Sequence, residues 1–273
     1  MTTPQRPSPD YVPERFWEER YATLDLTRSG HRDLPEAYNR WLYRRKQAVL
    51  RRSLRAAGFD PAGKRVMEIG VGTGVYVDFW KRLGVSAITG LDISSAAIEF
   101  LRRQHPGHDF LKCDVTEPDA QGACGSDFDL VTALDVLYHV VDDTRLERAL
   151  RNVRAALRPQ GLFAIHDQFL HRATEHRGYI RWRSLEDWQR LLAANGFEIV
   201  SRTPIFFSMI QTNDCATPRG AARMESLWGR LQPWMVRFPS LLGATGYALD
   251  TVLGRVLKEG PSMELMLVRR GAS

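Results

Sequence analysis

Cysteine is scarce in this chain, and its few cysteines are not arranged in pairs. The 273 residues include three, Cys113, Cys124 and Cys215, with no C-x-x-C spacing. This odd number argues against a disulfide framework and a structural zinc site, and predicts reduced thiols in a cytoplasmic protein. Long apolar stretches are also missing from the first residues, where prolines stand among polar side chains. Residues 1–13 are therefore expected to form a disordered arm, neither a signal peptide nor a transmembrane span.

An excess of acidic residues is likewise missing, since the net charge is +6. Much of the basic excess lies in one expected helix, in Arg44, Arg45, Lys46, Arg51, Arg52 and Arg55. We interpret this run as the solvated face of that helix, because charge alone does not establish a nucleic-acid or membrane partner. The composition, 44% hydrophobic and 26% charged, is ordinary for a globular protein. The length allows one large α/β domain with an appendage, or two small domains.

Glycines alternate with other residues directly after an apolar run. Glu68 precedes Gly70, Gly72 and Gly74, which makes the pattern E-x-G-x-G-x-G. A second apolar run ends in Asp92, eighteen residues after Gly74. On a parallel sheet, a glycine turn lets the backbone approach a nucleoside cofactor closely. An acid at the end of the next strand can accept hydrogen bonds from ribose hydroxyls, so the pattern predicts a site for such a cofactor.

Two classes of cofactor share this layout, and the loop separates them. A dinucleotide loop would read G-x-G-x-x-G, but Val75 stands three residues after Gly72, and Glu68 would place a negative charge beside a pyrophosphate. The same carboxylate suits a cofactor that carries an ammonium and a sulfonium. The motif resembles the first motif of the class I S-adenosylmethionine-dependent methyltransferases, and the resemblance covers residues 60–207 and, more weakly, 262–269. It implies an α/β, Rossmann-like doubly wound sheet of seven strands in the order 3-2-1-4-5-7-6, with the last strand antiparallel.

Strand and helix patterns alternate along the chain, as they do in parallel sheets. Strands are expected near residues 65–70, 86–92, 109–113, 128–134, 161–167, 197–207 and 263–268, with helices over 75–83, 94–104, 144–157, 185–195, 222–231 and 243–257. We expect an N-terminal helical cap over 14–58, a cofactor-binding core over 59–207, a helical insertion over 208–261, and the last strand with a tail over 262–273. A long insertion of this kind is expected either to roof the substrate pocket or to form a homodimer interface.

The resemblance assigns cofactor contacts to residues at the ends of several strands. Glu68 and the three glycines would hold the methionine part, Asp92 would bind the ribose, and Ile93 would pack on the adenine. After the third strand, Asp114 resembles the acid that accepts a hydrogen bond from the adenine amine, and Val115 follows it. Asp135 begins the fourth motif of the family, which borders cofactor and substrate. Residues of the cap that could reach the methionine carboxylate are Tyr21, Tyr38 and Arg40, although the aromatic residues of this segment could equally be packing core.

Two histidines at strand ends are candidates for a catalytic base. His166 ends the fifth expected strand and His139 follows the fourth, and the pKa of histidine lies near working pH. Each could instead be a hydrogen-bonded residue of the pocket wall. A Mg²⁺ site made by Asp135 and Asp167 is an alternative. Relatives that bind this metal carry an Asp-Asn pair, whereas Gln168 follows Asp167 here, so no metal is expected.

The fourth motif also bears on the acceptor. The stretch Asp135-Val136-Leu137-Tyr138 lacks the prolines found in methyltransferases that act on the amines of bases or on glutamine. It resembles the small-molecule branch of the family, so nucleic acid is not an expected partner. The first expectation is O-methylation of a natural-product, sugar, lipid or carboxylate oxygen. The alternatives are C- or N-methylation, a fold relative that binds the cofactor without transferring methyl, and a NAD(P)-dependent oxidoreductase.

Overall fold

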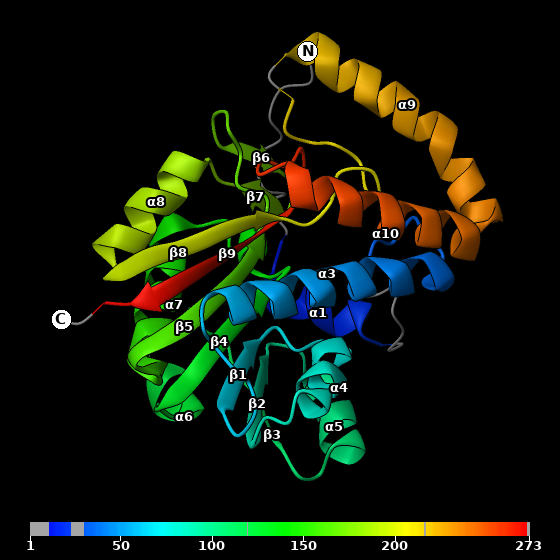
Figure 1. The fold of residues 1–273 in the computed structure, drawn as a ribbon. Helices are drawn as coiled ribbons and strands as arrows, with labels where there is room; N and C mark the ends of the chain where they lie inside the picture. The colour runs from blue at the N-terminus through cyan, green and yellow to red at the C-terminus, as the bar shows by residue number, and fades with distance from the viewer. Residues whose placement is uncertain (1–10, 23–29, 119, 216, 272–273) are drawn as a thin grey trace.

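A seven-stranded sheet forms the centre of the computed structural model, which describes residues 11–22, 30–118, 120–215 and 217–271 (Figure 1). Its strands are β1 (Arg65–Ile69), β2 (Ala87–Asp92), β3 (Asp109–Lys112), β4 (Phe128–Leu134), β5 (Leu157–Asp167), β8 (Phe197–Pro204) and β9 (Glu264–Arg270). They lie in the order β3-β2-β1-β4-β5-β9-β8. The first five strands in this order, from β3 to β5, pair in parallel, whereas β9 is antiparallel to both β5 and β8. Because β8 and β9 are the sixth and seventh strands of this sheet in chain order, the predicted strand order is confirmed.

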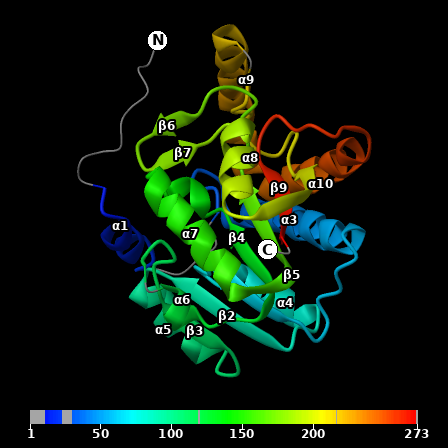
Figure 2. The same cartoon turned by 90° about the vertical axis from the view of Figure 1, so that its left-hand side faces the viewer.

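Helices cover both faces of the sheet (Figures 1 and 2). The helices between strands are α4 (Val75–Arg82), α5 (Ser95–Gln104), α6 (Ala120–Cys124), α7 (Asp143–Ala156) and α8 (Leu185–Ala194). Helix α3 (Glu36–Ala56) packs with α4 and α5 on one face, and α6, α7 and α8 pack on the other, so that two apolar clusters form. Because both faces of the sheet are buried, its strands need apolar side chains on both sides, which explains the apolar runs in the sequence.

Side-chain caps set the starts of several helices. The Oγ atom of Ser94 accepts a hydrogen bond from the backbone N–H of Ala97 at 3.3 Å, and Ser184 accepts one from Asp187 at 3.0 Å. Both bonds satisfy amides that have no partner within the first turn of a helix. These are the positions at which the sequence predicts helix starts.

Two short elements of the connections were not predicted. Strands β6 (Glu175–Arg177) and β7 (Ile180–Trp182) form an antiparallel hairpin, and a 3₁₀ turn, η1 (Leu137–His139), follows β4. Before α3 lies α1 (Pro13–Arg20). Residues 1–10 of the expected arm lie outside the described residues, whereas Tyr11 and Pro13 line the cavity discussed below.

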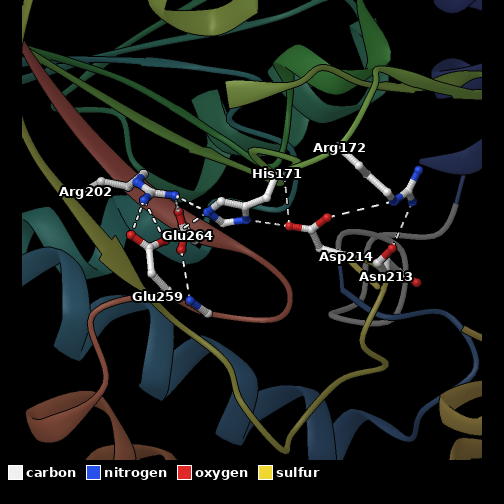
Figure 3. Close-up of polar contacts among 8 residues, drawn as sticks. His171, Arg172, Arg202, Asn213, Asp214, Glu259 and Glu264 are labelled. Carbon is white, nitrogen blue, oxygen red and sulfur yellow. Dashed lines mark hydrogen bonds and ion pairs between the residues drawn. The ribbon is translucent and has the colours of Figure 1, made fainter. Parts of the chain in front are cut away.

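The expected insertion contains two helices, α9 (Pro218–Arg237) and α10 (Pro239–Val256), both longer than the sequence pattern predicts. A polar network holds the two ends of this segment together (Figure 3). His171, in the loop after β5, lies with Nδ1 2.6 Å from Oδ2 of Asp214 and with Nε2 2.9 Å from Oε2 of Glu259. Asp214 precedes α9 and Glu259 follows α10, and Arg202 of β8 also pairs with Glu259. The ends of the insertion are thus joined to the core at one cluster.

The basic run of α3 is not a uniformly solvated face, contrary to our interpretation of the sequence. Arg51, Arg52 and Arg55 are exposed, but Arg45 and Lys46 are buried. The guanidinium of Arg45 donates hydrogen bonds to the carbonyl oxygens of Ile205 at 2.9 Å and Asp250 at 2.8 Å. Helix α10 covers this part of α3 and supplies the carbonyl oxygen of Asp250 and the hydroxyl of Thr251 as acceptors, so a buried cation is satisfied there.

Candidate active site

A cavity of about 620 Å³ opens at the carboxyl ends of β1, β2 and β4. This volume lies within the range of pockets that hold cofactors and small ligands. Its walls come from α1, α3, the loops after these strands, the β6–β7 hairpin and residues 206–213. The predicted site residues that line it are Tyr21, Glu68, Gly70, Asp92, Ile93, Asp114, Val115, Asp135 and His139.

The glycine loop after β1 has the backbone conformation that only glycine adopts readily. Gly70, Gly72 and Gly74 all have positive φ, at 69°, 50° and 79°. A Cβ atom added to Gly70 would lie 2.4 Å from Cγ2 of Val136. The loop thus packs closely against Val136, in the segment after β4, while Gly70 also lines the cavity.

Glu68 lies at the base of the cavity and is buried among apolar groups. Its Oε2 atom accepts a hydrogen bond from Nε1 of Trp80 at 3.1 Å. Burial raises the pKa of this carboxyl to about 8, despite the hydrogen bond from Trp80. No described basic residue forms an ion pair with it, so a bound cation would be its natural partner.

Asp92, the last residue of β2, holds the glycine loop in place. Oδ2 accepts a hydrogen bond from the N–H of Gly72 at 2.9 Å, and Oδ1 accepts one from the N–H of Ser94 at 2.9 Å. Burial raises the pKa of Asp92 to about 6, and these hydrogen bonds limit the rise. The carboxylate is therefore mostly ionised at neutral pH and can accept further bonds from ribose hydroxyls.

Asp114 follows β3 and is paired with a cation across the cavity wall. Its Oδ2 atom lies 2.6 Å from Nη2 of Arg145, on α7. Oδ1 accepts bonds from the backbone N–H and the hydroxyl of Thr116, at 2.8 and 2.6 Å. The side chain is thereby fixed at the position where the resemblance expects the adenine acid, next to Val115.

Asp135, directly after β4, is held by two neighbours that the sequence separates widely. Nζ of Lys46 lies 2.5 Å from Oδ2, and Nδ1 of His166 lies 2.8 Å from Oδ1. Burial by itself would raise the pKa of Asp135, but His166 and Lys46 hold it well below its usual range. The residue has φ of 65°, a left-handed conformation that is uncommon outside glycine. Lys46 was missed as a site residue because it stands in a run that looked solvated.

The two candidate bases occupy different surroundings. His166 is buried in β5, does not line the cavity, and its Nε2 atom has no hydrogen-bond partner among the described residues. Burial lowers its pKa, against the opposing effect of Asp135. His139 does line the cavity, and burial lowers its pKa to about 4. The structure therefore separates a pocket-wall histidine, His139, from His166, which contacts Asp135 inside the sheet.

The ring of His139 stands in a group of aromatic side chains. It stacks on Tyr179 of the β6–β7 hairpin, with centroids 5.4 Å apart and planes at 18°. Trp17 of α1 meets it edge-on at 4.9 Å. His139 Nδ1 lies 3.3 Å from the carbonyl oxygen of Tyr179. These contacts fix the plane of the imidazole at the cavity wall, although the hairpin that provides them was not predicted.

Two predicted cofactor residues of the cap lie elsewhere. Tyr38 is buried and its hydroxyl donates to the carbonyl oxygen of Met209 at 3.0 Å, while Arg40 is exposed and pairs with Glu36 at 2.7 Å. Neither lines the cavity, because α3 presents them to other neighbours. Tyr21, in contrast, does line it, together with Trp17. Glu18 of α1 accepts bonds from the N–H groups of Ser95 and Ala96, which anchors α1 to the start of α5.

The alternative of a metal pair is not supported by the placement of the two acids. Asp167 is fully buried in the sheet and does not line the cavity, and both oxygens of Asp135 face Lys46 and His166. Within the described ranges, no group of three or more His, Cys, Asp or Glu residues could hold a metal ion. The three cysteines are free thiols, of which Cys113 lines the cavity.

The residues of this cavity fit S-adenosylmethionine. Glu68, a buried carboxyl that forms no ion pair with the described residues, lines the cavity together with Gly70 of the glycine loop. Acidic side chains stand at the end of β2 and after β3, where a ribose and an adenine amine would need acceptors. A pyrophosphate would instead meet the negative charges of this wall, which disfavours a dinucleotide.

Comparison with known proteins agrees with this chemistry. Residues 38–202, more than half of the chain, match the family model of a methyltransferase domain. The chain is 29% identical to a probable phthiotriol/phenolphthiotriol dimycocerosates methyltransferase 2 of Mycobacterium ulcerans, over 68% of this chain and 66% of that protein. It is 28% identical to a fatty-acid O-methyltransferase of Mycolicibacterium smegmatis, over 67% of this chain and 60% of that protein. The matched region thus spans less than two thirds of either relative.

A solved structure shows the same fold. The 1,6-didemethyltoxoflavin-N1-methyltransferase of Burkholderia thailandensis, with bound 1,6-didemethyltoxoflavin and S-adenosylhomocysteine, superposes with a TM-score of 0.56. The match covers 98% of this chain and 94% of that chain, at 16% sequence identity. From the family match and the strand order together, we conclude that the chain belongs to the class I S-adenosylmethionine-dependent methyltransferases.

Proposed function

We propose that this protein transfers the methyl group of S-adenosylmethionine to an oxygen of a small, largely apolar acceptor. The observation that carries the proposal is His139, a half-buried imidazole in the wall of the cavity. Its lowered pKa keeps the ring neutral at pH 7, so that it can accept a proton. When bound, the cofactor supplies an electrophilic methyl group on a sulfonium.

In this proposal, the cofactor half of the cavity is formed by residues from the strand ends. Glu68 and the Gly70 loop hold the methionine part, Asp92 binds the ribose, and Ile93, Asp114 and Val115 surround the adenine. Asp135, held by its neighbours Lys46 and His166, borders the substrate side. Helix α1 covers the cofactor with Trp17 and Tyr21, as part of a cap over 14–58.

The acceptor half lies next to His139 and is lined mainly by apolar side chains. These are Leu42, Tyr138, Trp182, Phe206, Ile210 and Met263, with the polar side chains of Gln168 and Asn213 among them. Nδ1 of His139 can donate its proton to the carbonyl oxygen of Tyr179, which leaves Nε2 as the proton acceptor. The relatives named for lipid and fatty-acid substrates are consistent with an apolar acceptor. A cytoplasmic location and a homodimer stay predictions.

The test begins with calorimetric titration of the protein with S-adenosylhomocysteine, with NADH in parallel. We expect micromolar binding of S-adenosylhomocysteine alone, and loss of this binding in Asp92→Ala but not in the matched variant Asp109→Ala, whose acid is exposed. Binding of NADH alone would instead support the oxidoreductase alternative.

The second step is a transfer assay with labelled S-adenosylmethionine and a panel of fatty acids, phenols and hydroxylated isoprenoids. His139→Gln should lower kcat by about 10²- to 10⁴-fold, the usual contribution of a general base, without changing cofactor affinity. His108→Gln, which lies outside the cavity, should leave kcat unchanged. An active His139→Gln enzyme would show that the acceptor is acidic enough to need no base, as a carboxylate is, or that the base is another residue.

A further inference from the structure

Helices α9 and α10 of the insertion carry an exposed apolar surface that lies outside the cavity of the candidate active site. On α9, the side chains of Leu227, Leu231, Trp234 and Phe238 are between 42% and 59% exposed. Their spacing of four, three and four residues places them along one side of the helix. The rings of Trp234 and Phe238 stack with centroids 6.1 Å apart, so this side presents a continuous apolar stripe.

Helix α10 continues this stripe. Leu241, Leu249, Val252 and Val256 are between 47% and 74% exposed and recur at helical spacing. The opposite side of α10 packs on α3, where Gly243 meets Trp41. Phe238 ends α9 and immediately precedes α10, so the two stripes adjoin at the corner between the helices. In Figure 1 this corner lies at the outer edge of the molecule.

Exposed arginines flank the apolar stripe of α9. Four of them lie on the adjoining side of the helix: Arg219, Arg223, Arg230 and Arg237. None of the four forms an ion pair with an acidic residue of the described chain. Residues 218–258 contain six basic and two acidic residues. One of those acids, Asp250, is buried and accepts hydrogen bonds from the N–H groups of Phe207 and Ser208. The outer surface of the two helices is therefore apolar and cationic.

We propose that α9 and α10 dock this protein on the surface of a membrane that contains anionic lipids. An apolar side with Trp, Phe and Leu beside an arginine-rich side is the pattern of helices that lie in a membrane interface. Lipid phosphates supply the negative partners that the four arginines lack. No helix of the described residues is long and apolar enough to cross a membrane, so the interaction is with the surface. A second copy fits less well, because a symmetric interface would bring the same unpaired arginines of both copies together.

Docking here would bring the membrane close to one wall of the cavity. The ring of Trp228, on the inner side of α9, lies 6.0 Å from the ring of His31, and Gln232 donates to the carbonyl oxygen of Asp33 at 3.3 Å. Both His31 and Asp33 line the cavity. The membrane contact itself does not depend on methyl transfer, and its test needs no activity.

The test is co-sedimentation of the full chain with vesicles of phosphatidylcholine alone and of phosphatidylcholine mixed with phosphatidylglycerol. We expect binding to the anionic vesicles that weakens with salt, and little binding to the neutral ones. The variants Trp234→Ser/Leu241→Ser and Arg223→Gln/Arg230→Gln should each lower the partition coefficient about tenfold or more. Ile199→Ser/Val200→Ser, a matched apolar change at the exposed edge strand β8, should leave it unchanged.

Circular dichroism and thermal unfolding of each variant establish that it is folded, which is expected because the changed side chains are exposed. Absence of binding to anionic vesicles, or equal binding by all variants, would overturn the proposal. Light scattering tests the alternative that this surface binds a second copy of the chain. If Trp234→Ser/Leu241→Ser converts a dimer to a monomer while vesicle binding stays the same, the surface binds a second copy and the membrane proposal is wrong.

Discussion

The ammonium of Lys46 lies 2.5 Å from Oδ2 of Asp135, although 89 residues separate them in the chain. The two side chains are only 10% and 13% exposed. Asp135 has His166 as its second neighbour, and Lys46 is also placed over the ring of Tyr43. Helix α3 is thereby joined to the ends of β4 and β5 at the wall of the cavity.

Loss of this ion pair should destabilise the fold strongly. Lys46→Met leaves a buried carboxylate without its cation, which we expect to cost about 3 kcal/mol or more of the free energy of unfolding. The matched change is Lys64→Met, since Lys64 is 41% exposed and lies 3.9 Å from Asp129. That change should cost less than about 1 kcal/mol. Urea unfolding measures both, and equal losses would contradict the importance assigned to the buried pair.

Glu68 should make both stability and cofactor binding depend on pH. Its pKa in the folded protein, about 8, is above the value in an unfolded chain. The free energy of unfolding therefore falls as pH rises between these two pKa values. Glu68→Gln should therefore stabilise the protein by up to about 3 kcal/mol near pH 7 and by little near pH 4.

The same variant should bind S-adenosylmethionine more weakly, because the cation loses its carboxylate. Its affinity for S-adenosylhomocysteine, which lacks the sulfonium charge, should fall less. Urea unfolding at the two pH values and calorimetry with both ligands provide the measurements. A variant with unchanged affinity for both ligands would show that Glu68 only shapes the loop.

Gly70 should tolerate no side chain, and Gly58 provides a matched control. Both have a left-handed backbone, with φ of 69° and 73°, but an added Cβ meets Val136 at 2.4 Å in Gly70 and nothing within 4 Å in Gly58. Gly58→Ala should cost about 1 kcal/mol through backbone strain alone. Gly70→Ala should cost about 1 to 3 kcal/mol more from crowding and should lose binding of S-adenosylhomocysteine. If calorimetry shows equal binding by both variants, the loop does not hold the cofactor.

His171 should stabilise the protein mainly at low pH. Burial lowers its pKa, but hydrogen bonds to Asp214 and Glu259 outweigh this effect and raise it, while Arg202 opposes the charge. A histidine whose pKa is raised by folding stabilises the fold below its unfolded pKa and loses this effect as pH rises through the folded pKa. His171→Gln should therefore lower Tm more near pH 6 than near pH 9.

The half-buried His105 is the control for this measurement, because burial lowers its pKa and it forms no ion pair with a carboxylate of the described residues. His105→Gln should not lower Tm more at the lower pH. Thermal scans of both variants and the unchanged protein across this interval give the comparison. A pH-independent loss in His171→Gln would mean that the cluster in Figure 3 acts through packing alone.

The seven strands of the main sheet, their order and the glycine loop could be predicted from the sequence and the resemblance. Strand and loop positions depend on local properties, namely apolar runs and residues that must adopt positive φ, and capping side chains such as Ser94 set the starts of helices. The strand order came from the resemblance that these motifs carry. Asp92 also stands where the sequence predicts it. An acid at the carboxyl end of a buried parallel strand lies at the edge of the sheet where ligands bind.

The roles of the histidines, of Lys46 and of α10 could not be predicted in this way. A central strand is buried on both faces, so its pattern does not tell which of its polar residues faces a cavity, and His166 turned out to contact Asp135 instead. Arg45 and Lys46 looked solvated because the groups that satisfy them, Asp250 and Asp135, are distant in the chain. The sequence by itself determined where the strands of the main sheet and the glycine loop lie, since these positions follow from local patterns of apolar residues and glycines. Only the tertiary structure decided which histidine meets the cavity and which cations are buried, because those outcomes depend on side chains that folding brings together from remote segments.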